Sequence, residues 1–347
     1  MANIDPWSSA QIEDYEHIFK EFGLEKIPDE WRKKLDHHLF RRGLVVAHRD
    51  FGKVFQRIVG KKSFINMTGI ATSGRLHLGH KVDIDLFLFF KKKGGKNYFA
   101  VSDIDAYVSR PKIEQLSDAK KMAKDNVAHL LALGLDKKDL YHQSKKKPRY
   151  YEFSFEISKK ITENMYRAIY GHTDLGKISA VLLQIADILH PQLKEYEGVM
   201  PSVTGIGLEQ DPHAKITRDV AKRLPYKIEA PSFIYFKHQS GLKEGKKMSS
   251  SEPDTAIFLD DKPEDIKRKI SRSFTGGKDT VDEQKKHGGN PEICKIFELY
   301  KFHHPDDDFV KKVHTQCLKG KLMCGEDKQQ CIEFLTKMLK DHQKKLK

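Results

Sequence analysis

The segment from residue 63 to residue 102 most strongly limits the folds open to this chain. Phe64 to Ile70 is a short apolar run typical of a buried strand, and Leu78 to Phe90 has apolar residues at helical spacing. The basic cluster Lys91 to Lys96 ends that helix, and Asn97 to Ser102 begins a second strand. A strand, a helix and a strand in this order form a right-handed crossover between parallel strands. We therefore expect an α/β fold with a Rossmann-type parallel sheet.

The pattern of the remaining chain predicts three units. Residues 1–60 are charged and mainly helical in pattern, and they hold no recognisable chemical motif. Residues 61–262 alternate strands and helices, with further strands near Val199 to Ile206 and Ser232 to His238. Beyond residue 262 the strand signal disappears, and we expect residues 263–347 to form an all-helical unit.

Composition restricts the compartment and the partners. Charged residues make up 32% of the 347 residues and the net charge is +14, which favours a polyanionic partner such as nucleic acid. A general lysine bias would explain the same charge. The four cysteines include no C-x-x-C pair, so we expect no zinc or iron–sulfur site. No apolar stretch is long enough to span a bilayer, and no secretory signal opens the chain. We expect a cytoplasmic protein with reduced thiols and no membrane partner.

Two short motifs, HLGH and KMSSS, carry the clearest chemical signal. The first, His77 to His80, follows a strand and opens a helix, where free N–H groups and the helix dipole favour phosphate. Gly79 leaves room for an adenine ring, and the two histidines can donate to phosphate oxygens. The second motif consists of Lys247, Met248, Ser249, Ser250 and Ser251.

KMSSS lies in a stretch rich in glycine, lysine and serine, from Gly241 to Ser251. We expect this loop to be exposed and mobile, so that Lys247 can swing toward a triphosphate. Taken alone, HLGH can be a helix cap and KMSSS an ordinary surface loop. Taken together, they predict two halves of one ATP site.

The stretch Gly205 to His213 follows an apolar strand, at the edge where open α/β sheets bind ligands. Gly207 would permit close approach of an adenosine, and Glu209 could accept hydrogen bonds from ribose hydroxyls. Gln210 could reach a second substrate. A turn followed by a capped helix would explain the same residues.

Polar residues in two further segments could complete a substrate site. Gln184 and Asp187 lie at i and i+3 on one face of a helix that is otherwise apolar. Asp103 and Asp105 end the second strand and could line the same cleft. The alternatives are an internal hydrogen-bonded pair and a polar strand end, respectively.

Assembled, these residues resemble the motifs of class I aminoacyl-tRNA synthetases. HLGH matches the HIGH motif of that family and KMSSS its KMSKS motif. The closer resemblance is to tryptophanyl-tRNA synthetases of the archaeal and eukaryal type, in GLEQDPHAKITRD, KMSSSEPDTAIFLDD and FTGGKDTVDEQKKHGGN, and to the archaeal branch in QIADILHPQL. The resemblance runs from about residue 60 to the C-terminus.

This resemblance implies ATP-dependent attachment of tryptophan to tRNA(Trp) through a tryptophanyl-adenylate, with Mg²⁺ accompanying ATP. It implies catalytic roles for His77, His80 and Lys247. It implies that residues 263–347 bind the anticodon and that the protein is a homodimer. The implied ATP-binding residues are His77, Gly79, His80, Gly207, Glu209, Lys247, Met248, Ser249 and Ser250. The implied tryptophan-binding residues are Met67, Asp105, Gln184, Asp187 and Gln210.

The chain departs from the family pattern at several positions. Ser250 replaces the second lysine of KMSKS, so Lys247 and its neighbour Lys246 must supply the charge of the loop. Eukaryal tryptophanyl enzymes place a tyrosine at Met67 and a glutamine near Ala100, both reaching the indole N–H. Asp187 is therefore our candidate partner for that N–H group.

Two alternative functions compete with this interpretation. Tyrosyl-tRNA synthetases of archaeal type share HLGH, Gln184 and Asp187, but they place at position 67 a tyrosine that grips the substrate hydroxyl. Met67 cannot do so, and its thioether suits the face of an indole. A non-catalytic tRNA-binding paralogue would be expected to lose the motif histidines or Lys247 first, and this chain retains them.

Overall fold

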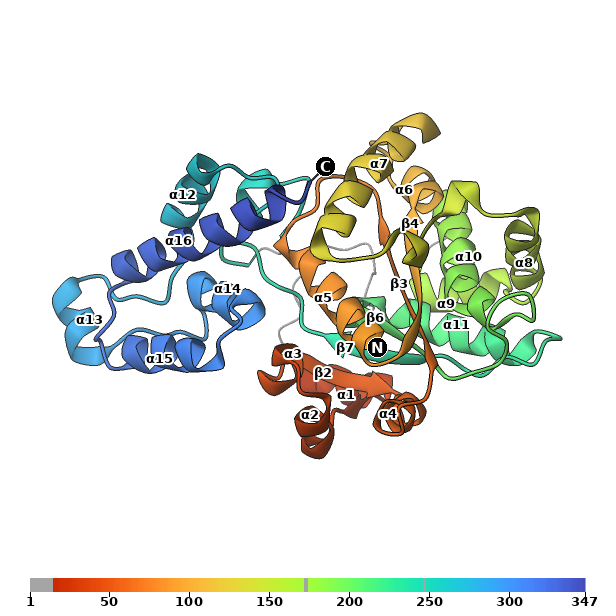
Figure 1. Cartoon of the computed structure of the whole chain (residues 1–347), viewed down its shortest axis with the longest axis horizontal. Helices are drawn as coiled ribbons and strands as arrows, with labels where there is room; N and C mark the ends of the chain where they lie inside the picture. Colours follow the sequence, from red (N-terminus) through yellow and green to blue (C-terminus); the bar gives the residue numbers. More distant parts are fainter. Residues whose placement is uncertain (1–14, 172–173, 246–247, 347) are drawn as a thin grey trace.

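A seven-stranded sheet forms the centre of the protein, which a computed structural model describes over residues 15–171, 174–245 and 248–346. The strands follow the spatial order β1-β2-β7-β6-β3-β4-β5, and Figure 1 labels β2, β7, β6, β3 and β4. Their bounds are β1 (Glu25–Lys26), β2 (Val45–Arg49), β3 (Phe64–Ala71), β4 (Gly95–Ser102), β5 (Leu140–His142), β6 (Ser202–Gly207) and β7 (Ser232–Phe236).

Five of these strands form the parallel sheet that the sequence predicts. Each neighbouring pair among β7, β6, β3, β4 and β5 is parallel. The chain runs outward from β3 to β5 on one side and from β6 to β7 on the other, so the order reverses between β3 and β6, where Met67 pairs with Thr204. Ligands of open α/β sheets bind at the carboxyl ends of the strands beside such a reversal. The expected Rossmann-type fold is confirmed.

The N-terminal segment contributes two strands that the sequence analysis did not predict. β2 pairs antiparallel with β7, and the two-residue β1 pairs antiparallel with β2. Phe40 and Phe51 of this segment pack in one cluster with Phe90 and Ile234, so the segment shares a core with the sheet. The helices dominate its sequence pattern because both strands are short. The division of the chain at residues 60 and 262 stays a prediction.

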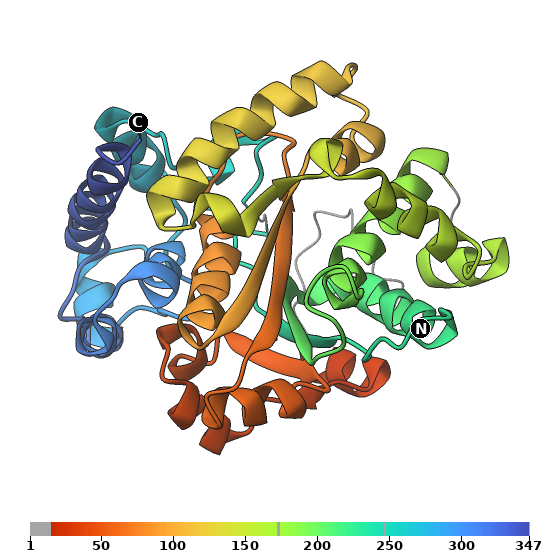
Figure 2. The same ribbon diagram turned by 45° about the vertical axis from the view of Figure 1, so that its right-hand side comes forward.

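The helices surround the sheet in groups that Figures 1 and 2 separate. α5 and α7 lie along β3 and β4, α8 to α11 lie on one side, and α12 to α16 gather on the other. Ser102 ends β4 and residues 103–109 form α6, so Asp103 and Asp105 lie in a helix directly after the strand rather than at its end. The helix bounds are α1 (Tyr15–Phe22), α2 (Asp29–Leu35), α3 (His38–Arg41), α4 (Gly52–Val59), α5 (Leu78–Lys92), α6 (Asp103–Ser109), α7 (Leu116–Leu133), α8 (Pro148–Ser158), α9 (Glu163–Tyr170), α10 (Leu175–Leu189), α11 (Asp211–Arg223), α12 (Pro263–Ser271), α13 (Val281–His287), α14 (Lys295–His303), α15 (Asp307–Leu318) and α16 (Cys324–Gln343).

Candidate active site

A pocket opens where β3, β4 and β6 end, between α6 and α10. Its wall contains the five residues that were expected to bind the amino acid, contributed by β3, α6, α10 and the turn before α11. These residues are Met67, Asp105, Gln184, Asp187 and Gln210. The pocket lies at the reversal of strand order, so the topology of the sheet explains why residues so far apart in sequence meet there. That they bind the amino acid stays a prediction.

Asp187 is held in this pocket by three hydrogen bonds. The hydroxyls of Tyr141 and Tyr150 donate to its Oδ1 at 2.7 and 2.6 Å, and Gln143 Nε2 donates to its Oδ2 at 2.7 Å. Burial raises the pKa of Asp187 to about 6, although these hydrogen bonds favour the ionised form. Gln184 is not among its partners, so the alternative of an internal Gln184–Asp187 pair is wrong.

A positively charged side chain, that of Lys146, lies near Asp187. Lys146 Nζ lies 4.2 Å from the centre of the Tyr141 ring and 2.9 Å from His190 Nε2. His190 Nδ1 faces the carbonyl oxygens of Ala186 and Asp187 at 2.9 and 3.0 Å, so Nδ1 carries the ring proton and Nε2 accepts from Lys146. Burial lowers the pKa of Lys146 to about 8, so it is mostly protonated at pH 7. Its charge favours the ionised form of Asp187.

The two aspartates of α6 have different surroundings. Asp105 lines the pocket and accepts a hydrogen bond from Ser109 Oγ at 3.0 Å, and burial raises its pKa to about 6. Asp103 is fully buried and accepts from the backbone N–H and the hydroxyl of Ser144 at 2.9 and 2.5 Å. Asp103 does not line the pocket. The expectation that both aspartates line the cleft is wrong for Asp103, which instead ties α6 to the segment after β5.

A second pocket lies at the start of α5 and is lined by His77, Gly79 and His80. The backbone N–H of His77 donates to His80 Nδ1 at 3.2 Å, and the two rings stack 3.8 Å apart. Burial and the nearby His238 lower the pKa of His80 to about 4, so the ring is neutral at pH 7. Because Nδ1 accepts, the proton lies on Nε2, which can donate to a ligand oxygen.

The KMSSS motif lies against the HLGH motif. Met248, Ser249 and Ser250 line the second pocket together with the histidines, and Ser250 Oγ donates to the carbonyl oxygen of Arg75 at 2.9 Å. Beyond the motif, the chain pairs with Leu78, whose N–H donates to the carbonyl oxygen of Ile257 at 2.9 Å. The described parts of the two motifs thus meet at one pocket. Lys247 lies outside the described residues, so its place stays a prediction.

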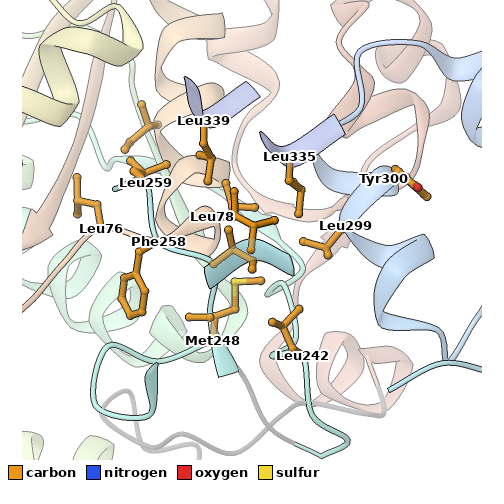
Figure 3. Packing of buried hydrophobic residues seen from close by; sticks show 14 of the residues in the cluster. Leu76, Leu78, Leu242, Met248, Phe258, Leu259, Leu299, Tyr300, Leu335 and Leu339 are labelled. Atoms are coloured by element: carbon orange, nitrogen blue, oxygen red, sulfur yellow. The ribbon is translucent and has the colours of Figure 1, made fainter. Parts of the chain in front are cut away.

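The loop around KMSSS is exposed at residues 243–245 and at Ser251, as expected, but two of its apolar side chains are buried. Leu242 and Met248 are only 1% and 5% exposed. Figure 3 shows Met248 beneath Leu78, with Phe258 and Leu242 to either side. The same cluster continues to side chains of the C-terminal helices, among them Leu299, Tyr300, Leu335 and Leu339. Isolated apolar residues therefore anchor a loop whose glycine, lysine and serine content indicates exposure.

Gly207 and Glu209 lie beside the second pocket rather than in its wall. A Cβ at Gly207 would collide with His238 Nε2 and with the Glu209 carboxylate. Glu209 pairs with His238, which does line the pocket, and accepts from Gln210 Nε2 at 3.2 Å. Gly207 is therefore required for the seating of Glu209 and His238. The predicted contact of Glu209 with ribose hydroxyls stays a prediction.

Several site residues were missed by the sequence analysis. Tyr141 and Gln143 lie at the end of β5, and Arg110 follows α6. Their only sequence signal is that they follow strand or helix ends on the carboxyl side of the sheet, which many residues share. The missed residues are Arg110, Tyr141, Gln143, Lys146, Tyr150 and His238.

Asp211, which follows Gln210, has a structural role. Its buried carboxylate accepts hydrogen bonds from Arg49 at 2.8 Å and from the Tyr235 hydroxyl at 2.6 Å, which joins α11 to β2 and β7. Removing one partner of a buried ion pair leaves the other charge uncompensated. We expect Asp211→Ala to lower the free energy of unfolding by about 3–5 kcal/mol in urea titrations. Asp219→Ala, at an exposed position of the same helix, should change it by less than about 0.5 kcal/mol; equal losses in the two variants would contradict this role.

The described residues hold neither a metal-binding cluster nor a membrane-spanning helix. No group of three or more histidine, cysteine, aspartate or glutamate side chains in that part of the chain could hold a metal ion. Within the same residues, no helix is long and apolar enough to cross a membrane. All four cysteines, Cys294, Cys317, Cys324 and Cys331, are free of disulfides.

A parallel sheet with HLGH and the described residues of KMSSS at one pocket, and a second pocket with polar lining residues beside it, has a clear counterpart among known families. Residues 60–340 match the family model described as "tRNA synthetases class I (W and Y)". The match covers most of the chain, and the chain belongs to this family.

Individual relatives are named for the tryptophan branch. The chain is 38% identical to the "Tryptophan--tRNA ligase" of Aeropyrum pernix, over 99% of this chain and 94% of the relative. It is 36% identical to the enzyme of that name from Methanocaldococcus jannaschii, over 99% and 95% of the two chains.

Solved structures agree. The crystal structure of the Aeropyrum pernix K1 tryptophanyl-tRNA synthetase superposes with a TM-score of 0.90, at 38% identity, covering 99% of this chain and 95% of that chain. The tryptophan-bound enzyme of Encephalitozoon cuniculi superposes with a TM-score of 0.83 at 25% identity, covering 97% and 95% of the two chains.

Proposed function

We propose that this protein attaches L-tryptophan to tRNA(Trp) in two steps. The tryptophan carboxylate attacks the α-phosphorus of ATP, which gives tryptophanyl-adenylate and releases pyrophosphate. The adenylate then esterifies the terminal adenosine of the tRNA and releases AMP. The observation that carries this proposal is the adjacency of two pockets. One is lined by Met67, Gln184 and Asp187, and the other by the described residues of both motifs. The relatives named tryptophan–tRNA ligase support the same reaction.

The surroundings of Asp187 favour an indole as the side chain recognised. An ionised carboxylate has about four acceptor positions. Three are filled by Tyr141, Tyr150 and Gln143, two of them on Oδ1. A remaining position on Oδ2 can accept the indole N–H, while Met67 offers an apolar face to the ring.

At the other end of the tryptophan pocket, Asp105 would pair with the substrate ammonium, with Gln184 and Gln210 as hydrogen-bonding neighbours. In the second pocket, His77, His80 and the serines after Met248 would bind the ATP phosphates. Lys247 would stabilise charge on the leaving pyrophosphate. Mg²⁺ would arrive bound to the triphosphate, because in such sites it is held largely by substrate phosphates. Positioning and charge stabilisation then suffice, without a covalent enzyme intermediate.

The biological setting proposed is that of a cytoplasmic homodimer. The free thiols fit a reducing compartment. The homodimer is what the resemblance to the class I tRNA synthetase family implies. Helices α12 to α16 would bind the tRNA anticodon. Light scattering on the purified protein tests the dimer, and a mass near that of one 40.1 kDa chain would contradict it.

The first experiment is ATP–pyrophosphate exchange with purified protein and no tRNA, with tryptophan and tyrosine supplied separately. Exchange with tryptophan alone is the expected result. Exchange with tyrosine alone would assign the protein to the other branch of the family. If neither supports exchange, the assay is repeated with tRNA, and continued inactivity would favour a non-catalytic tRNA-binding paralogue.

Tryptophan affinity is expected to fall as the pH falls. Ionised Asp187 and Asp105 are needed to accept from the indole N–H and the ammonium group, and burial raises both pKa values to about 6. Above pH 7 both carboxyl groups are mostly ionised, so the affinity for tryptophan should be at its maximum there. One such group is about tenfold less ionised at pH 5, so the dissociation constant should rise roughly a hundredfold between pH 7.5 and 5.

Equilibrium dialysis with labelled tryptophan measures this dependence. Asp187→Asn keeps an acceptor oxygen but does not titrate, so only about a tenfold rise, from Asp105, should remain. A dependence as steep as that of the natural protein would show that Asp187 is not one of the titrating groups.

A further inference from the structure

One charged side chain lies where the two pockets meet. The pocket proposed for tryptophan and the pocket proposed for ATP have a single described lining residue in common, Arg110. Arg110 follows the last residue of α6, directly after Ser109, so the helix that carries Asp105 also fixes its position. The reaction joins the carboxylate of one substrate to the α-phosphorus of the other. The reacting atoms must therefore lie at this junction, within reach of residues that face both pockets.

Arg110 has no protein partner there. Its guanidinium makes no hydrogen bond or ion pair with any described residue, and its Nε is buried without an acceptor. Asp105 is near enough to interact with its charge but forms no ion pair with it. Arg75, by contrast, pairs with Asp260 and Asp261. A buried donor without an acceptor is costly and rare in native structures, so this guanidinium fits an anion that arrives with the substrates.

The anion at this junction is the α-phosphate. When the tryptophan carboxylate oxygen bonds to the α-phosphorus, the bond from that phosphorus to the bridging oxygen of pyrophosphate breaks. Negative charge on the α-phosphate oxygens increases at that moment. A guanidinium is always charged and offers several donors in one plane, which suits two phosphate oxygens.

We propose that Arg110 binds the α-phosphate and stabilises its charge during adenylate formation. This inference rests on the proposed function, and it adds a catalytic residue that the HLGH and KMSSS motifs do not include. The adenylate still contains the α-phosphate, so the contact between Arg110 and this phosphate persists after pyrophosphate leaves. Arg110 therefore also helps to retain the adenylate until tRNA arrives.

The test compares natural protein with Arg110→Met, which keeps a long unbranched side chain without charge, and Arg110→Lys. Three quantities are measured: the tryptophan-dependent exchange rate, the dissociation constant of tryptophan, and that of tryptophanol adenylate, an unreactive phosphodiester. In Arg110→Met we expect about a 100- to 1000-fold slower exchange, in line with the loss of one donor to transition-state charge. The same variant should bind tryptophanol adenylate about a hundredfold more weakly than the natural protein does, and its affinity for tryptophan should stay within about twofold of normal. The exchange rate and the tryptophanol adenylate affinity of Arg110→Lys should lie between those of Arg110→Met and the natural protein.

Thermal unfolding serves as the control that the variants fold normally. Arg110 has no partner to lose, so the midpoint of Arg110→Met should equal or exceed that of the natural protein. Arg167→Met, which removes an exposed arginine of α9, should leave all three quantities unchanged. Unchanged affinity for tryptophanol adenylate, or an equal loss of affinity for tryptophan, would overturn the role of Arg110 while the proposed function stands. Absence of exchange in the natural protein, with or without tRNA, would overturn both.

Discussion

Replacing Lys247 with alanine is expected to slow tryptophan-dependent ATP–pyrophosphate exchange about a thousandfold. The lysine would neutralise charge that accumulates on the pyrophosphate as it leaves, and a single donor of this kind is worth about 3–4 kcal/mol of transition-state stabilisation. The loss should appear in kcat, with little change in tryptophan affinity, because the interaction strengthens only in the transition state.

The fold should survive this substitution. The loop is anchored at its described ends by the buried side chains of Leu242 and Met248, and neither is altered. Thermal unfolding should therefore give an unchanged midpoint. Lys243→Ala is the matched control, because it removes an exposed lysine of the same loop and should retain normal exchange. Normal turnover in Lys247→Ala would remove Lys247 from the mechanism.

Loss of the Asp187 carboxylate is expected to abolish the preference for an indole N–H group. A hydrogen bond to a charged acceptor contributes about 1.5–3 kcal/mol, so the natural protein should use tryptophan about 10- to 150-fold better than β-(3-benzothienyl)alanine, which has sulfur in place of N–H. In Asp187→Ala the two substrates should differ by no more than about threefold. The ratio of kcat/KM values in the exchange assay measures this preference.

The same variant should be less stable. Tyr141, Tyr150 and Gln143 would each lose an acceptor, and we expect a loss of about 3 kcal/mol in urea unfolding. Gln184→Ala is the comparison variant, because Gln184 is expected to contact the part of the substrate that both amino acids share. Gln184→Ala should lower kcat/KM for both substrates by the same factor and keep the preference for tryptophan. A preference retained in Asp187→Ala would mean that another group reads the indole N–H.

The β-α-β unit, with HLGH at the start of its helix, could be predicted because these signals are local. Apolar runs and helical spacing mark β3, α5 and β4 within 40 residues of sequence, and HLGH lies after β3, where α5 begins. Gln184 and Asp187 were paired correctly on one face because helical geometry relates i to i+3.

Other features had no local signal. β1 and β2 are short, and their place is decided by the pairing of β2 with β7, which lies almost 190 residues away. Met248 looks like part of a polar loop until Leu78 and Phe258 pack around it. Asp103 and Asp105 are two residues apart in one helix, yet Asp103 accepts a hydrogen bond from Ser144 while Asp105 lines the pocket.

The sequence by itself determined the fold class, the ATP motifs and the set of polar residues suited to the substrate, because periodicity and short spacings follow from backbone geometry. Only the tertiary structure decided which of those residues line a pocket and which are bound by other protein groups. Tyr141, Tyr150 and Gln143 became partners of Asp187, and Arg110 came to border both pockets, through the reversal of strand order between β3 and β6. Contacts of that kind join distant segments, and their energy depends on the packing of the whole sheet rather than on any single stretch of chain.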